Sequence, residues 1–280
     1  MKSEGRKIHM STKKIPFYKY QGAGNDFVLI DHRAEQYIDP KDVSTINKLC
    51  DRRFGIGGDG LILLQNHPDY DFEMIYFNAD GTEGSMCGNG GRCIVAFAKF
   101  LGVIQDTCRF IAIDGPHEAT INEAGNWVEL KMIDVQEVAC NPDHYVMNTG
   151  SPHYVKFVPA VKNLDVFKDG RAIRYSETYK AEGINVNFTA TTPKGLDVLT
   201  YERGVEDETF ACGTGVTAAA ISFFLDQPEK ALGFLRNGGI PIQAKGGQLK
   251  VRFDIKDKVF SNIWLCGPAD YVFEGITHGN

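Results

Sequence analysis

The 280-residue chain carries 30 Lys and Arg against 36 Asp and Glu, which gives a formal net charge of -6. This balance, without a long basic run, excludes the usual electrostatic character of a nucleic-acid-binding protein. No apolar stretch approaches 18 residues, so no membrane span is predicted. We therefore expect a small-molecule partner and, from the length, two domains.

Residues 1–9 show no hydrophobic periodicity and are predicted to be a disordered lead-in or a tag. The polar start lacks the apolar core of a signal peptide, so we expect a cytoplasmic protein. Seven cysteines without an export signal do not favour disulfides, and without a C-x-x-C motif no metal site is predicted. Five are predicted to be small buried hydrophobic residues: Cys50, Cys93, Cys108, Cys140 and Cys266.

In the first half of the chain, the alternating segment Tyr70–Phe77 predicts a half-buried strand. It leads to Cys87 and a glycine-rich string, after which an apolar segment of helical length runs to Gly102, placed as a C-terminal cap. This segment is apolar almost all round, so the helix must be enclosed on every side. Glu118–Met132 then alternates about Gly125 and Asn126 and predicts a hairpin.

The second half repeats this order. Leu196–Glu202 predicts a strand that leads to Cys212 and a second glycine-rich string. Another apolar helix follows, and Pro241–Asp254 alternates about Gly246 and Gly247 as a hairpin. Strand, Cys-Gly loop, buried helix and hairpin therefore occur twice in the same order.

The repetition predicts an internal duplication and an α+β fold of two pseudo-symmetric domains. Each domain is expected to be a mostly antiparallel sheet rolled around its central buried helix. The N-terminal domain, which carries Cys87, is predicted to comprise residues 10–133 and 268–280. The C-terminal domain, residues 134–267, carries Cys212.

A cysteine just before a glycine-rich helix start lies among backbone N–H groups that have no partner within the helix. We expect such a position to lower the pKa of the thiol, and the same N–H groups can bind a carboxylate. Two such cysteines facing each other could invert a carbon centre, one thiolate removing a proton and the opposite thiol delivering another. No dinucleotide or phosphate-binding motif and no lysine in a Schiff-base context is found, which favours an amino-acid racemase or epimerase without a cofactor.

Five strings together resemble the diaminopimelate epimerase family, from about Phe17 to the C-terminus. They are GAGNDFVLID (22–31), FNADGTEGSMCGNGGRC (77–93), GSPHYV (150–155), INVNF (184–188) and YERGVEDETFACGTGVTAAA (201–220). The resemblance implies interconversion of LL- and meso-2,6-diaminopimelate for lysine and peptidoglycan precursors, with Cys87 and Cys212 as the acid and base. It also implies the matching fold, no cofactor and a homodimer.

The resemblance further implies which residues hold the substrate. One end is expected at the two helix N-termini: Gly88, Asn89, Gly213 and Thr214. The distal amino-acid end is expected at four residues: Asn78, Asn185, Glu202 and Arg203. Asn25 lies in the motif that lines the pocket, and His153 and Glu202 match positions that adjust the cysteine pKa values; a histidine can change charge near neutral pH.

Two departures from the family pattern stand out: Ser151 replaces a common Asn, and Gly60 a Gln found in some members. Because of these two departures, the sequence does not decide which residues contact the distal end of the substrate. A related racemase or isomerase acting on another polar amino acid is the main alternative. A redox switch between Cys87 and Cys212 and a non-catalytic anion-binding module are the others.

Overall fold

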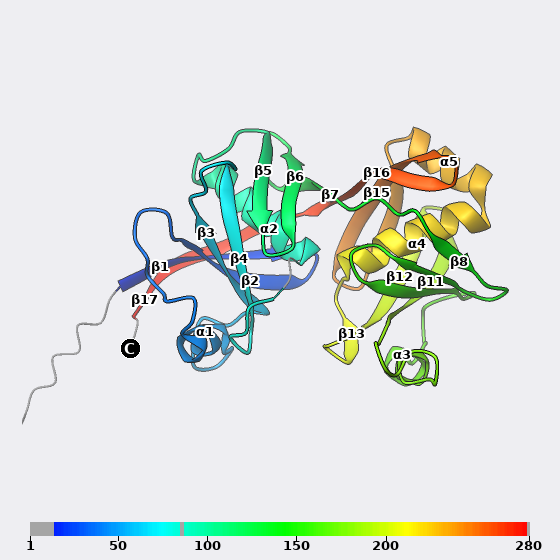
Figure 1. Cartoon of the computed structure of the whole chain (residues 1–280), viewed down its shortest axis with the longest axis horizontal. Helices are drawn as coiled ribbons and strands as arrows, with labels where there is room; N and C mark the ends of the chain where they lie inside the picture. The colour runs from blue at the N-terminus through cyan, green and yellow to red at the C-terminus, as the bar shows by residue number, and fades with distance from the viewer. Residues whose placement is uncertain (1–13, 85–86, 279–280) are drawn as a thin grey trace, which may run out of the picture.

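The computed structural model describes residues 14–84 and 87–278, which form two lobes side by side (Figure 1). The first lobe contains the N-terminal half of the chain and the last strand. The second lobe contains the rest. The predicted lead-in, residues 1–9, lies outside the described residues.

The first lobe is built from strands around one central helix, with a short helix at its margin (Figure 1). Its elements are β1 (Lys14–Gly22), β2 (Asn25–Asp31), α1 (Val43–Cys50), β3 (Gly60–Gln65), β4 (Phe72–Asn78), α2 (Gly88–Phe100), β5 (Thr107–Ala112), β6 (Gly115–Ile121), β7 (Trp127–Lys131) and β17 (Asp270–His278).

The second lobe has the same plan with one additional helix. Its elements are β8 (Val138–Cys140), β9 (Tyr145–Asn148), β10 (Pro152–Phe157), α3 (Val166–Arg174), β11 (Asn185–Thr192), β12 (Gly195–Glu202), β13 (Asp207–Thr209), α4 (Gly213–Asp226), α5 (Pro228–Arg236), β14 (Ile240–Ala244), β15 (Gly247–Lys256) and β16 (Val259–Pro268).

Strand pairing confirms the duplicated order. From β1 to β7, successive pairs run antiparallel, parallel, antiparallel, parallel, antiparallel and antiparallel. From β9 to β16, passing over β13, the pairs run in the same order. The short helices α1 and α3 follow the second strand of each set, and the central helices α2 and α4 come after the fourth. The predicted α+β fold of two mostly antiparallel halves is therefore correct.

The central helices are enclosed as their composition predicts. In α2 the run from Asn89 to Ala98 is buried, and α4 is buried along most of its length to Phe223. Gly102 ends α2 in a left-handed conformation, with φ +70°, and its N–H donates to the carbonyl of Lys99. Because sheet strands surround both helices (Figure 1), each helix is fixed along its axis and at its N-terminus.

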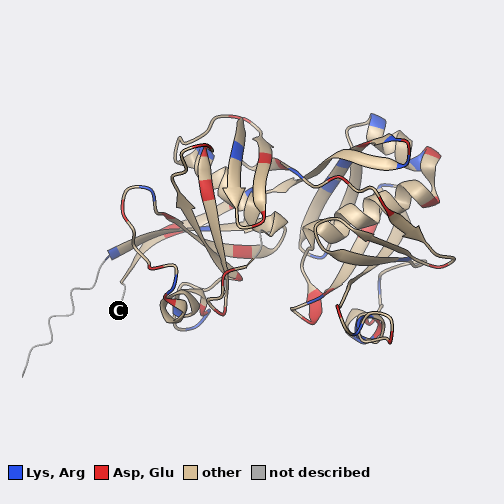
Figure 2. Cartoon of the chain, viewed as in Figure 1, with Lys and Arg blue, Asp and Glu red and all other residues tan. Residues whose placement is uncertain are grey.

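The strands β7 and β16 pair antiparallel and join the two lobes. Separate hydrophobic cores fill the lobes around α2 and α4, and Met132 packs against both. The domain boundaries at 133/134 and 267/268 stay a prediction. Acidic and basic residues are interspersed along both lobes (Figure 2). No helix in the described chain is long and apolar enough to cross a membrane.

One prediction about the cysteines is wrong. Cys50, Cys93, Cys108 and Cys266 are buried, but Cys140 is exposed. Cys140 ends the three-residue strand β8, in which its neighbour Ala139 is exposed as well. A strand this short packs against one neighbour and leaves its end in solvent, so the residue type alone does not decide burial there.

Candidate active site

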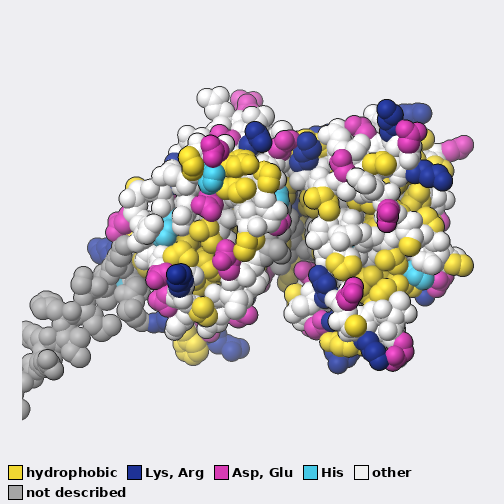
Figure 3. All heavy atoms as spheres, in the orientation of Figure 1, with side chains coloured by type: hydrophobic (Ala, Val, Ile, Leu, Met, Phe, Trp, Pro, Cys, Tyr) yellow, Lys and Arg dark blue, Asp and Glu magenta, His cyan; other side chains and the backbone are white. Residues whose placement is uncertain are grey.

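The two Cys-Gly strings meet between the lobes, where Figure 3 shows a furrow on the viewed face. Cys87 and Cys212 are the N-cap residues of α2 and α4. The helix starts face each other so closely that a Cβ atom on Gly213 would lie 3.5 Å from the Cα of Gly88 and 2.8 Å from Cδ2 of Leu265. Glycine at both positions therefore lets the two cysteine-bearing backbones come together.

The side chain of Asn89 joins the lobes. Its Nδ2 donates to Oδ1 of Asn25 at 2.7 Å and to the carbonyl oxygen of Ala211 at 2.8 Å. Its Oδ1 accepts from Arg92 at 2.9 Å, and the whole residue is buried. Because both amide donor hydrogens have partners within the protein, the backbone is the part of Asn89 that can contact a substrate.

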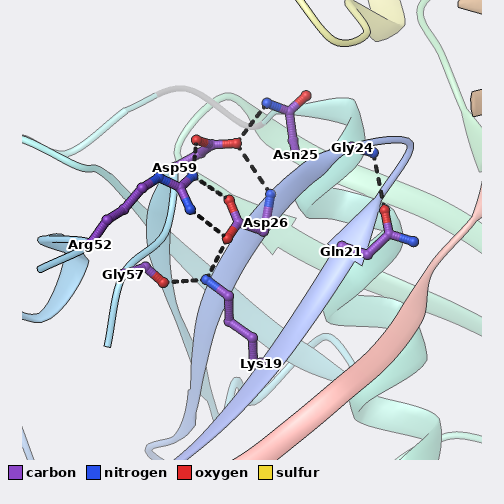
Figure 4. A network of polar contacts seen from close by, with 8 residues as sticks. All are labelled: Lys19, Gln21, Gly24, Asn25, Asp26, Arg52, Gly57 and Asp59. Carbon is purple, nitrogen blue, oxygen red and sulfur yellow. Dashed lines mark hydrogen bonds and ion pairs between the residues drawn. The ribbon is translucent and has the colours of Figure 1, made fainter. Parts of the chain in front are cut away.

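Asn25 is held by a network of charges on one side of the first lobe (Figure 4). Its Nδ2 donates to Oδ2 of Asp59 at 2.9 Å, and Arg52 bridges Asp59 at 2.7 Å and Asp26 at 2.6 Å. Lys19 pairs with Asp26 at 2.7 Å. Partial burial opposes ionisation of Asp26, but hydrogen bonds from Arg52 and Lys19 outweigh it and lower the pKa to about 2. The network fixes the turn that carries Asn25.

A second polar group lies at the open ends of β11 and β12. Oδ1 of Asn185 accepts from the backbone N–H of Arg203 at 2.8 Å, and its Nδ2 donates to Oγ of Ser151 at 2.9 Å. The Arg203 guanidinium reaches the same Ser151 hydroxyl at 3.4 Å and the carbonyl of Glu182 at 3.1 Å. Ser151, which departs from the family pattern, thus contacts two of the predicted distal residues directly.

The other departure, Gly60, has a steric cause. Gly60 pairs with Asn78, and a Cβ atom on it would lie 2.5 Å from both Cε2 of Tyr76 and the carbonyl oxygen of Phe77. Tyr76 therefore occupies the space that a side chain at position 60 would need. Asn78 ends β4 and is exposed, which leaves its amide accessible.

Burial raises the pKa of both catalytic candidates, Cys87 and Cys212. At Cys87, backbone N–H groups of α2 and the charge of Arg92 oppose the rise, while the Glu202 carboxylate adds to it. At Cys212, Glu202 also raises the pKa, and a hydrogen bond with Thr214 lowers it. The prediction that the helix start lowers the thiol pKa is wrong in its net sign, because desolvation exceeds the effect of the N–H groups.

His153 also differs from the prediction. It is buried, with Nδ1 3.1 Å from Nδ2 of Asn187 and Nε2 2.8 Å from Oγ1 of Thr214. Burial and the charge of Arg203 lower the pKa of His153 to about 3. It therefore stays neutral near pH 7, and the prediction that it changes charge there is wrong.

Glu202 lies at the end of β12, and the charge of its carboxylate adds to the rise in the pKa of both cysteines. Burial raises the pKa of its carboxyl group. The sequence patterns do not predict three residues of the site: Tyr76, Arg92 and Asn187. Their strand and helix patterns resemble those of core residues, and only their tertiary position brings them to the site. In the described chain, no three His, Cys, Asp or Glu side chains lie together as metal ligands.

A family model described as diaminopimelate epimerase matches residues 17–138 and 145–272 of this chain. The chain belongs to the diaminopimelate epimerase family. A diaminopimelate epimerase from Flavobacterium psychrophilum is 51% identical over 261 residues, covering 93% of this chain and 99% of that protein. Another family member, from Aquifex aeolicus, is 37% identical and covers 93% and 97%. The predicted family is confirmed.

Solved structures share the fold at low sequence identity. A phenazine biosynthesis protein from Bacillus anthracis has a TM-score of 0.69 at 14% identity, covering 95% of this chain and 99% of that one. A hydroxyproline epimerase from Agrobacterium vitis, solved with trans-4-OH-L-proline, has a TM-score of 0.65 at 11% identity, covering 95% and 92%. At these identities the likeness shows the two-lobed fold alone.

Proposed function

We propose that the protein is a cofactor-independent diaminopimelate epimerase that interconverts LL- and meso-2,6-diaminopimelate for lysine and peptidoglycan precursors. Family membership identifies the activity. The observation that carries the mechanism is that two helix N-termini, each with a cysteine as its N-cap residue, lie against each other. A Cβ atom built on Gly213 would lie only 3.5 Å from the Cα of Gly88.

The reaction is a proton exchange at one carbon. A thiolate at one cysteine removes the α-proton, and the C–H electron pair remains on the substrate as a carbanion. The thiol of the opposite cysteine then protonates the other face, so its S–H bond breaks and a new C–H bond forms. One thiol and one thiolate remain with their positions exchanged, which allows the reverse reaction to use the same groups.

The helix starts stabilise this carbanion. Charge delocalises into the α-carboxylate, and the backbone N–H groups of Gly88, Asn89, Gly213 and Thr214 are placed at the positive ends of two helices. Asn89, Cys212 and Gly213 are buried, and the lower polarity around them strengthens the electrostatic contacts at the helix starts. The helix ends therefore act more strongly on the charged intermediate than on the neutral-carbon ground state.

The distal amino-acid end of the substrate is assigned to the second polar group. Arg203 offers a planar pair of donors for a carboxylate, and Ser151 and Asn185 lie beside it. Glu202 and Asn78 are the acceptors assigned to the distal ammonium group. Asn25 contributes to the pocket wall through its contact with Asn89.

We include a cytoplasmic homodimer in the proposal and expect no nucleic-acid or membrane partner. Exposed apolar side chains on β17 and at the end of α2 support self-association: Phe100, Tyr271, Val272 and Phe273. Light scattering across a concentration series measures the assembly. A mass of one chain at all concentrations would contradict the dimer.

The activity is tested with purified protein, LL-diaminopimelate and no added cofactor. We expect meso-diaminopimelate to accumulate until the isomers reach equilibrium, measured by chiral chromatography. Proline, hydroxyproline, lysine and glutamate serve as control substrates. Turnover of one of these and not of diaminopimelate would refute the substrate while leaving the epimerase chemistry in place.

A further inference from the structure

A line of hydrogen bonds runs from β12 to the sulfur of Cys212, buried at its β12 end and partly buried at Thr214. Oγ1 of Thr200 donates to Oδ1 of Asn187 at 2.9 Å, and Nδ2 of Asn187 lies 3.1 Å from Nδ1 of His153. Nε2 of His153 lies 2.8 Å from Oγ1 of Thr214, which is 3.4 Å from Sγ of Cys212. Four successive hydrogen bonds therefore end at this sulfur.

The direction of these bonds follows from one carbonyl group. Nδ2 of Asn187 also donates to the backbone oxygen of Tyr154 at 3.1 Å, and a carbonyl oxygen can only accept. The NH2 side of the amide therefore faces His153, so Nδ1 of the ring must accept. A neutral imidazole with Nδ1 unprotonated carries its proton on Nε2, which then donates to Thr214.

The Thr214 hydroxyl can then serve both states of Cys212. One of its lone pairs accepts from His153, which leaves its O–H and a second lone pair. The O–H can donate to a thiolate, and the lone pair can accept from a thiol. If His153 carried its proton on Nδ1 instead, Nε2 would compete for the Thr214 proton and the thiolate would lose this donor.

The Asn187 amide is tightly packed against the start of α4. A Cβ atom on Gly215, the third residue of α4, would lie 2.3 Å from its Oδ1. Asn187 and His153 are fully buried, and Thr200 is 3% exposed, so water does not compete for the bonds among these three residues. The glycine leaves the space in which the amide turns its oxygen to Thr200 and its nitrogen to His153.

We propose that Asn187 and Thr200 are positioning residues that hold the His153 proton on Nε2 and so keep the Thr214 hydroxyl available to the Cys212 thiolate. Neither touches the sulfur. Their effect on turnover rests on the proposed function, whereas the proton position and the ionisation of Cys212 do not. Other groups that act on this site are Glu202 and Cys87, which face Cys212, and Arg203, which faces His153.

Asn187→Asp tests the direction of the line. A carboxylate offers no hydrogen to Nδ1, so the ring proton should move to Nδ1 to face it. Nitrogen-15 NMR of labelled histidine in the full chain should find the His153 proton on Nε2 in the wild type and on Nδ1 in the variant. A wild-type ring protonated on Nδ1 would overturn the proposal.

Alkylation measures the consequence at the sulfur. The rate of Cys212 modification by iodoacetamide is followed against pH by mass spectrometry, without substrate. Loss of one hydrogen bond to a charged group should raise the Cys212 pKa by about one unit, in both Asn187→Asp and Thr214→Val. Unchanged alkylation profiles in both variants would also overturn the proposal.

A matched pair of valine substitutions separates this role from packing. Thr200→Val removes the donor to Asn187, whereas Thr189→Val alters a buried hydroxyl on β11 that has no hydrogen-bond partner in the described chain. We expect Thr200→Val to lower kcat about 10-fold with KM unchanged, and Thr189→Val to stay within about 2-fold of wild type. Equal effects in both would show a packing role only.

Wild type that turns over no diaminopimelate, yet shows the predicted proton position and alkylation shifts, would refute the function and retain this inference.

Discussion

The two cysteine-bearing helices start alike, but their surroundings differ. Five residues beyond Cys87, Arg92 donates to the carbonyl of Gly88 at 3.2 Å. Five residues beyond Cys212, Thr217 donates to the equivalent carbonyl of Gly213 at 3.0 Å. A buried cation therefore stands on the Cys87 side at the position where the Cys212 side has a neutral hydroxyl.

The second difference lies at the second residue of each helix. Asn89 links the lobes through Asn25 and Ala211, while Thr214 links His153 to the sulfur of Cys212. The duplicated backbone places both sulfurs, and the unshared side chains control how each one ionises. This asymmetry matches a reaction in which one cysteine is a thiolate while the other is a thiol.

The largest expected effect comes from removing either sulfur. Cys87→Ala and Cys212→Ala should each lower kcat by roughly 100- to 10,000-fold, because in the proposed mechanism each sulfur is the proton donor or acceptor for one face. Cys140→Ala, at an exposed cysteine, is the matched control and should be fully active. Steady-state kinetics in both directions make the measurement, and near-normal turnover by either active-site variant would contradict the mechanism.

The Arg92 comparison tests the electrostatic difference directly. Arg92→Met should raise the pKa of Cys87 and lower kcat/KM about 10-fold at neutral pH, since the cation favours the thiolate. Arg92→Lys should restore part of this loss. Thr217→Val is the matched substitution in the second lobe and should leave the pH profile unchanged. The comparison fails if the Met variant and the Thr217 variant give the same pH profile.

His153 makes a prediction about stability in acid. Its pKa is about 3 in the folded protein and near 6.5 when unfolded, so below pH 6.5 the unfolded chain binds a proton that the folded chain does not. Stability present above pH 6.5 should be lost as the pH falls toward 3, by about 1.4 kcal/mol per pH unit from this group. Urea unfolding of His153→Gln should show a shallower pH dependence over this range; parallel curves would contradict the assignment.

The smallest effect is expected at the distal group. Ser151→Ala removes one acceptor shared by Asn185 and Arg203, and should raise KM a few-fold with kcat almost unchanged, on the order of 1 kcal/mol. Ser151→Asn, the family's common residue, should bind substrate at least as well as wild type. A fall in kcat in Ser151→Ala with KM unchanged would place Ser151 in the chemical step instead.

Local patterns predicted the elements that local chemistry controls. Alternation over Tyr70–Phe77 predicted the strand that the structure has at Phe72–Asn78, and the cap at Gly102 ends α2 as expected. The errors concern burial. The desolvation of Cys87, Cys212 and His153 depends on how the folded chain packs around them, and the periodicity of the sequence does not predict this packing. Asn187 was not predicted for the same reason, since the orientation of its amide depends on a hydrogen bond to the Tyr154 carbonyl on the neighbouring strand.

The central claim is that each cysteine serves one face of the same carbon, and solvent deuterium labelling tests it most directly. In D2O, a thiol that has equilibrated with solvent should deliver deuterium to the inverted centre, while unreacted substrate stays almost unlabelled. This should hold from either stereoisomer, measured by mass spectrometry and NMR at under about a tenth of the approach to equilibrium. Comparable early labelling of substrate and product, or original hydrogen retained in the product, would indicate a single base and contradict the two-cysteine mechanism.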